Sequence, residues 1–296
     1  DKFNFIMEQG FYMLNKKTAS ILDCFKIKNI VDLYNNSNLD SFYNVNIPIL
    51  SYLFLKKCYY ILRGNRILGI VFIDSKVKNI YYIPKVMYRV MPLETITNFL
   101  YSNFNISGYI MHINYIKKQY INKNIIMPAE IKENIKFMHI KTYKDKKYSL
   151  KENEQIRKIN IFGNEEIRVC LQNKIFEYKN IKGRINLTIN DILSEESSPY
   201  FLKDYCFLLE KNNNSCGYAQ IILIENNFFL VNFGIVPEER GRGLGNSFLN
   251  EIINICFQNK IEDLYLTVDN SNKSAIKLYT TAGFKEKYNT VTVKYN

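Results

Sequence analysis

Histidine is scarce in this sequence, and several short motifs of enzyme chemistry are missing. Only two histidines occur, His112 and His139, and each lies in an apolar run typical of a strand. The six cysteines form no C-x-x-C pair, and no Gly-x-Ser-x-Gly motif is present. These absences argue against a zinc site, a dithiol redox site and a serine-hydrolase elbow. We expect no metal, and we expect reduced cysteines in a cytoplasmic protein.

Long uncharged apolar runs and dense basic runs are also missing. No window reaches the length of a membrane span, and the N-terminus lacks the basic, apolar and small-residue order of a signal peptide. The formal net charge is +12, but the lysines stand singly among Ile, Asn and Tyr. We therefore expect neither a membrane nor a nucleic acid as partner, although a diffuse positive field would help to collect an anionic ligand.

What the sequence does contain is a glycine-rich turn between a strand and a helix. Apolar and β-branched residues at 229–236 predict a strand, which Pro237 ends. The turn R-G-R-G-L-G at 240–245 follows, and apolar residues at intervals of three and four then predict an amphipathic helix. The start of a helix offers unpaired N–H groups at a partly positive end, and glycines leave them uncovered. This pattern predicts a phosphate or pyrophosphate site, with charge-assisted hydrogen bonds from Arg240 and Arg242.

The residues after this turn separate it from other phosphate-binding loops. A P-loop needs Lys and then Ser or Thr after its last glycine, where this chain has Asn246. A dinucleotide fold stays compatible up to this point, because Asp269 ends the next predicted strand, 264–268. Beyond Asp269 the chain reads N-S-N-K-S-A-I-K-L-Y-T-T-A-G-F, which predicts a helix capped by Asn272 and ended by Gly283.

Together, the two motifs resemble the acetyl-CoA-binding half of the GNAT superfamily of N-acetyltransferases. The matching residues are Val236, Pro237, Arg240 to Gly245, Asn272, Ala275, Leu278, Tyr279, Gly283 and Phe284. The resemblance implies an α/β fold of the mixed α+β kind, with a mostly antiparallel sheet flanked by helices. It also implies that acetyl-CoA is the acyl donor. The acetyl group would pass by direct attack to a primary amine, on an acceptor that the sequence does not identify.

The resemblance assigns site residues as well. Those expected to bind the cofactor are Phe233, Gly234, Ile235, Val236, Arg240, Gly241, Arg242, Gly243, Leu244, Gly245, Asn246, Asn272, Ala275 and Tyr279. The strand residues would hold the pantetheine arm and the turn residues the pyrophosphate. Tyr279 would be the catalytic acid, because a phenol with a pKa of ~10 stays protonated at neutral pH and can donate to a thiolate. A tyrosine beside Leu278 at helical spacing can also simply pack, and we favour the catalytic interpretation.

The base is not evident from the sequence. Many members of the family place a carboxylate on the strand before the turn, but residues 231–233 read Val-Asn-Phe here. Either the acceptor has an amine of low pKa, or water carries its proton away, or a carboxylate comes from elsewhere. Asp191, Glu195 and Glu196 are candidates, although such acids more often lie solvated on the surface. The missing carboxylate leaves an alternative open, a catalytically weak module that binds acetyl-CoA as a sensor or structural ligand.

The first part of the chain repeats the pattern of the second part without its glycine turn. Residues 58–84 and 205–237 each read as a strand, a polar turn, a strand with a glycine (Gly69 or Gly217), another polar turn, and a strand that ends at proline. After Pro84 the sequence K-V-M-Y-R-V-M has no glycine that could expose a backbone cradle. This similarity predicts an internal duplication, with an unrelated first domain as the alternative.

We therefore expect two tandem GNAT-like domains. The first, 1–130, would be a degenerate copy, and the second, 131–296, would be the N-acetyltransferase domain that binds acetyl-CoA. A homodimer is a possible oligomeric state that the sequence does not decide. Local patterns predict a strand at 135–143 and helices at 18–34, 153–162, 165–178 and 188–201, the last with a Thr-x-x-Asp cap.

Overall fold

The chain folds into two compact units. The computed structural model describes residues 14–37, 47–85, 92–115, 128–142, 153–158, 163–177 and 186–296. One unit contains 1–136 and 288–296, and the other contains 137–287. Residues 288–296 thus belong to the first unit, whereas the division expected from the sequence, between 130 and 131, places them in the second domain. The predicted fold class is confirmed: the structure is a mixed α/β fold whose strands pair mostly antiparallel.

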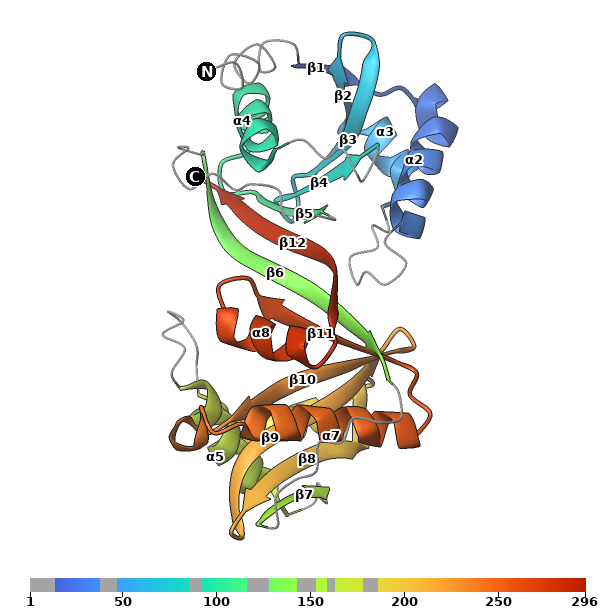
Figure 1. Cartoon of the computed structure of the whole chain (residues 1–296). Coiled ribbons are helices and arrows are strands. Elements are labelled where there is room, and N and C mark those ends of the chain that lie inside the picture. The colour runs from blue at the N-terminus through green and yellow to red at the C-terminus, as the bar shows by residue number, and fades with distance from the viewer. Residues whose placement is uncertain are drawn as a thin grey trace, which may run out of the picture. The chain divides into compact units, whose positions relative to one another are not determined.

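The first unit has helices on both sides of its strands (Figure 1). Its strands pair in the order β1 (Leu14–Thr18), β2 (Cys58–Arg63), β3 (Arg66–Asp74), β4 (Asn79–Pro84), β5 (Ile110–Tyr115) and β12 (Lys285–Tyr295). Its helices are η1 (Ile21–Asp23), α2 (Cys24–Ser37), α3 (Ile49–Phe54) and α4 (Leu93–Asn103). Alternate residues of β3 supply two cores, because successive side chains of a strand point to opposite faces. Val71 packs with the α4 side, whereas Ile70 and Phe72 pack with α2 and α3.

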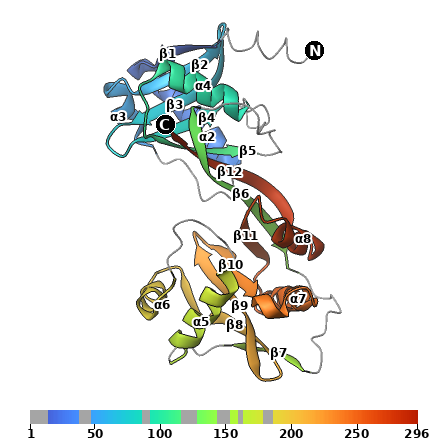
Figure 2. The same ribbon diagram turned by 90° about the vertical axis from the view of Figure 1, so that its left-hand side faces the viewer.

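The second unit places α5 and α6 on one side of its strands and α7 on the other (Figure 2). Its strands pair in the order β11 (Asp263–Asp269), β10 (Asn227–Ile235), β9 (Asn214–Ile224), β8 (Phe201–Lys211) and β7 (Glu154–Lys158). Its helices are α5 (Glu165–Phe176), α6 (Ile189–Glu196), η3 (Pro237–Glu239), α7 (Leu244–Gln258) and α8 (Lys273–Thr281). The residues of β6 (Ala129–Lys141) and of β12 are divided between the two units, and the part of β12 that belongs to the first unit begins at Tyr288.

Two helix predictions in the second unit are wrong in part. Residues 154–158 of the predicted helix at 153–162 instead form the strand β7, in which Ile156 pairs with Leu209 and Arg157 donates to Glu210 across 2.8 Å. Pairing with β8 therefore overrides the local helical pattern. Residues 159–162 lie outside the described residues. The predicted helix at 188–201 ends at Glu196, because Pro199 follows it and residue 201 already begins β8.

The predicted helix at 18–34 begins late for a local reason. Thr18 ends β1, and Ser20 then forms a capping box with Asp23, whose carboxylate accepts from the Ser20 N–H across 2.9 Å. The start of the helical segment is set by this cap. The glycine-free sequence after Pro84, at 86–91, lies outside the described residues.

Candidate functional site

β10 separates from β11 partway along its length. The parallel pairing of β10 with β11 covers 228–230, whereas its antiparallel pairing with β9 continues to Ile235. A register shift precedes Gly234, and Asn232 within it has a φ of 52°. Such a bulge bends the strand and ends its regular pairing. Within the described residues, the edge of β10 at 231–235 therefore has no partner strand, and an extended ligand arm with amide groups can bind there.

The glycine turn presents a row of unpaired backbone N–H groups. Gly241 and Gly243 have φ values of 75° and 85°, and a Cβ at either position would meet no atom within 4 Å. In the described part of the chain, the five N–H groups of 241–245 donate to no protein acceptor, whereas those of Asn246 and Ser247 donate to the Gly243 oxygen. These N–H groups lie at the positive end of α7 and beside open space. They form a cradle suited to a phosphate group.

The two arginines of the turn contact other parts of the protein. Arg240 donates from Nε to the carbonyl oxygen of Ile235 across 2.8 Å and from Nη2 to that of Ile175. Its side chain thereby ties the turn to the end of β10 and to α5. Arg242 is largely exposed and lies 3.1 Å from the Glu239 carboxylate. A phosphate contact by either arginine stays a prediction.

Tyr279 lies on α8 beside the separated end of β10. Its ring centroid is 6.1 Å from that of Phe233 and 5.9 Å from that of Phe284, and the residue is 8% exposed. Burial raises the pKa of its phenol to about 12, and no other described group perturbs that pKa. The hydroxyl is therefore protonated at neutral pH, and within the described residues it is free to donate to a ligand.

The remaining predicted residues surround these features. A Cβ at Gly245 would lie 3.6 Å from the Leu278 side chain, which places the start of α7 against α8. Asn272 caps α8 by accepting from the N–H of Ala275 across 3.2 Å. The structure thus brings the turn, the end of β10 and α8 together. Because the Asn272 side chain serves as a cap, direct contact of Asn272 and Ala275 with a cofactor stays a prediction.

Comparison with known sequences agrees with this arrangement. Residues 180–284 match the sequence model of the acetyltransferase (GNAT) family. Residues 180–284 are thus a GNAT domain. The [ribosomal protein bS18]-alanine N-acetyltransferase of Escherichia coli (strain K12) is 33% identical over 82 residues, which are 27% of this chain and 54% of that protein. The chain thus spans about half the length of the curated relatives that it matches.

Solved structures share the fold over nearly the whole chain. A GCN5-related N-acetyltransferase from Sphaerobacter thermophilus superposes with a TM-score of 0.56 at 14% identity, covering 95% of both chains. A GNAT-family acetyltransferase from Colwellia psychrerythraea gives a TM-score of 0.50 at 13% identity and covers 96% of this chain and 99% of its own. At these identities the likeness shows the fold alone.

The second unit also holds a buried polar network that the sequence motifs do not reveal. Its members come from α5, α6, β9 and β10, and they are Arg168, Glu195, Glu196, Tyr218, Gln220 and Asn232. Arg168 is fully buried and donates from Nε to the Tyr218 hydroxyl across 3.2 Å. Its Nη1 donates to Glu196, and its Nη2 lies 3.4 Å from Oε2 of Glu195. Arg168 lies on the sheet-facing side of α5, where its charge loses hydration. The hydrogen bonds to these acceptors compensate for that loss.

Gln220 connects this network to the bulge of β10. Its Oε1 accepts from the Tyr218 hydroxyl at 3.0 Å and from Nδ2 of Asn232 at 3.3 Å. Its Nε2 donates to Oε1 of Glu195 across 3.2 Å. A chain of two hydrogen bonds therefore leads from Asn232, inside the bulge, to the carboxylate of Glu195.

The three acids considered from the sequence have different surroundings. The expectation of a solvated surface position is wrong for Glu195 and Glu196, whose side chains are 21% and 11% exposed because they flank Arg168. Asp191 instead forms the capping box of α6 with Thr188, accepting from its N–H across 2.8 Å. The sequence signal that could have indicated the network is Arg168, a charge that shares a helix face with Leu171 and Ile175.

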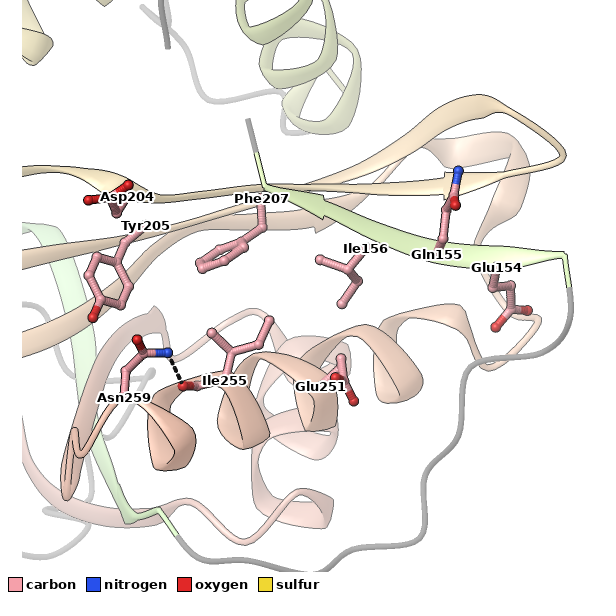
Figure 3. Close-up of a pocket in the computed structure, with 9 residues that line it drawn as sticks. All are labelled: Glu154, Gln155, Ile156, Asp204, Tyr205, Phe207, Glu251, Ile255 and Asn259. Carbon is pink, nitrogen blue, oxygen red and sulfur yellow. Dashed lines mark hydrogen bonds between the residues drawn. The ribbon is translucent and has the colours of Figure 1, made fainter. Parts of the chain in front are cut away.

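A pocket lies elsewhere in the second unit, between β7, β8 and α7. It has a volume of about 450 Å³, and Figure 3 shows Ile156, Phe207 and Ile255 turned toward its interior. None of the residues that we expect to bind the cofactor lines it. In the described ranges, no group of three or more His, Cys, Asp or Glu residues is arranged to hold a metal ion. Within those same ranges, no helix is both long and apolar enough to cross a membrane.

Proposed function

We propose that this protein is an N-acetyltransferase that moves the acetyl group of acetyl-CoA to a primary amine. The observation that carries the proposal is the row of five unpaired N–H groups at 241–245, next to the partnerless edge of β10. Residues 233–236 would hold the pantetheine arm, and the turn would hold the pyrophosphate. When bound, acetyl-CoA supplies an activated acetyl thioester. The absence of Cβ atoms at Gly241 and Gly243 supports the fit, since the space there is open.

Tyr279 is suited to protonate the departing thiolate. A free thiol has a pKa of ~8.5, so a thiolate accepts a proton from a group that is itself protonated at neutral pH. The Tyr279 phenol, with a pKa of about 12, meets this condition. Its ring is fixed between Phe233 and Phe284, which keeps the hydroxyl at the end of β10 where the thioester would lie.

The first acceptor to test is the α-amino group of a peptide. The E. coli relative is by name an alanine N-acetyltransferase of a ribosomal protein. An α-amine has a pKa of roughly 8, far below that of a lysine side chain at about 10.4, so it reaches its neutral form with less help. This suits a site whose β10 residues 231–233 carry no carboxylate.

Thiol release from acetyl-CoA tests the proposal. The amines to compare are a peptide that begins with alanine, the same peptide with a blocked N-terminus, and butylamine. We expect release with the first peptide only, and we expect calorimetry to show one acetyl-CoA per chain. Binding without release from any amine would favour the alternative, a module that retains acetyl-CoA without turnover. Absence of binding would reject both functions.

We further propose that the first unit is a degenerate copy of the GNAT domain. Both units run strand, two helices, three antiparallel strands, helix and strand, from β1 to β5 and from β7 to β11. In each, the fourth of these strands pairs parallel with the fifth. Gly69 and Gly217 correspond, and a Cβ at either would lie 2.7 or 2.8 Å from a side chain of the next strand. Two acetyl-CoA molecules per chain would contradict a degenerate first site.

A further inference from the structure

The buried network of the second unit contains more negative than positive charge. Among the described residues, Arg168 is its single cation, and it faces two carboxylates. Its Nη1 donates to Glu196 and its Nε donates to Tyr218. Glu195 receives from Arg168 only the long 3.4 Å contact with Nη2, and its other hydrogen bond comes from the uncharged amide of Gln220. One guanidinium neutralises one carboxylate. Glu195 is therefore the less compensated of the two.

The surroundings of Glu195 suit a group that gains and loses a proton. Arg168 faces it from α5, Glu196 from its own helix, and Tyr218 and Gln220 from β9, with the buried thiol of Cys206 on β8 beside Tyr218. Burial raises the pKa of Glu195. Arg168 and the hydrogen bond from Gln220 oppose this increase, and Glu196 adds a smaller increase. Its side chain is 21% exposed, so protons can reach it, whereas Arg168 behind it is fully buried.

Glu195 is connected to the separated part of β10 through Gln220 and Asn232, and Tyr279 lies on the other face of that strand. Asn232 bonds to Gln220 on the face covered by α5 and α6. The next residue, Phe233, stacks on Phe248 of α7 at 5.3 Å and lies beside Tyr279. A proton acceptor on one face and a proton donor on the other can thus serve one reacting group at this edge.

A buried donor without a partner lies on the same face of α5. Gln172 is 2% exposed, and among the described residues its Nε2 has no acceptor. It is four residues after Arg168 and three before Ile175, whose Cγ2 would lie 2.3 Å from a Cβ at Gly234. Buried amide groups are nearly always hydrogen-bonded, so an unused donor beside β10 points to a ligand acceptor there.

We propose that Glu195 is the base of the acetyl transfer described above, and this assignment rests on that proposed function. Glu195 takes one proton from the ammonium form of the acceptor, directly or through one water, and leaves a neutral amine. As the N–C bond forms and the C–S bond breaks, Tyr279 gives its proton to the thiolate. The second proton of the nitrogen returns to Tyr279 through solvent. Arg168 and Gln220 are positioning residues that hold the carboxylate.

The pH dependence of Glu195→Gln tests the assignment, with Glu196→Gln as the matched control. Both variants should bind acetyl-CoA with wild-type affinity in calorimetry. With the alanine-terminated peptide at pH 7, we expect Glu195→Gln to lower kcat/KM by roughly 100-fold and Glu196→Gln to have a much smaller effect. The loss in Glu195→Gln should shrink above the pKa of the α-amine, roughly 8, where the amine is already neutral.

The outcomes separate the two proposals. A loss in Glu195→Gln that is the same at every pH would show a structural role and overturn the assignment, as would wild-type activity. No thiol release from the wild-type protein with bound acetyl-CoA would overturn the transfer function and the base together. If Glu195→Gln unfolds at lower urea than Glu196→Gln, then Glu195→Asp decides, because it keeps a carboxylate. It should restore the wild-type pH profile, and a profile like that of Glu195→Gln would overturn the assignment.

Discussion

Replacing Gly243 with alanine isolates the contribution of the glycine turn to acetyl-CoA binding. Gly243 has a φ of 85°, and Gly163, in the loop before α5, has a φ of 81°. A Cβ at either position would meet no atom within 4 Å. Both substitutions therefore add backbone strain without a clash, which costs about 1–2 kcal/mol of folding free energy. For a unit of this size we expect each to lower the Tm by about 2–8 °C.

Of these two glycines, only Gly243 belongs to the segment 241–245, whose N–H groups are unpaired. A methyl group there occupies space that a phosphate oxygen needs, whereas strain alone raises the free energy of the free and bound protein alike. Losing one hydrogen bond to a charged group costs about 1.5–3 kcal/mol, which raises the Kd about tenfold or more. Calorimetric titration of Gly243→Ala should show this increase, and Gly163→Ala should keep the wild-type Kd. Equal Kd values for the two variants would refute the assignment of the cradle.

Three further predictions concern Tyr279, the packing of α5 and the buried network. Tyr279→Phe should leave the Kd for acetyl-CoA unchanged and lower kcat for thiol release by about 100-fold. Because burial raises the pKa of Tyr279 to about 12, the wild-type pH–rate profile should show no decline from its ionisation at pH 10 or below. Gly234→Ala should lower the free energy of unfolding by about 1–3 kcal/mol, because its methyl would press on Cγ2 of Ile175. Ile175→Leu, which lacks that methyl, should recover part of the loss in the double variant, and additive urea midpoints would contradict this contact. Arg168→Met should lower the free energy of unfolding by about 3–5 kcal/mol, since two largely buried carboxylates lose their cation. A urea midpoint close to the wild-type value would show that the network does not depend on Arg168.

The parts of the fold that the sequence predicts well are those with short-range signals. The glycine spacing at 240–245 and the apolar period after it indicate the turn and the start of α7. Likewise, Asn272 and Gly283 flank α8, which begins at Lys273 and ends at Thr281. Each of these signals depends on neighbours along the chain, so no long-range contact is needed to read it.

The missed features depend on contacts between distant residues. β7 carries a pattern that also suits a helix, and only its pairing with β8, about fifty residues later, makes it a strand. The assignment of residues 288–296 to the first unit likewise depends on a distant contact, the pairing of Val293 with Met111. The network joins Arg168 to Tyr218, and the sequence around either residue does not indicate its partner. The sequence does not indicate the bulge at Asn232 either, since an asparagine with positive φ has no distinct local pattern.

The most direct test of the account counts two products in one reaction. Wild-type protein is incubated with acetyl-CoA and the alanine-terminated peptide, and released thiol is measured together with acetylated peptide by mass spectrometry. We predict one acetylated α-amine for each thiol released, with both products reduced together in Tyr279→Phe. Thiol release without acetylated peptide, or bound acetyl-CoA that yields neither product, would contradict transfer to this amine.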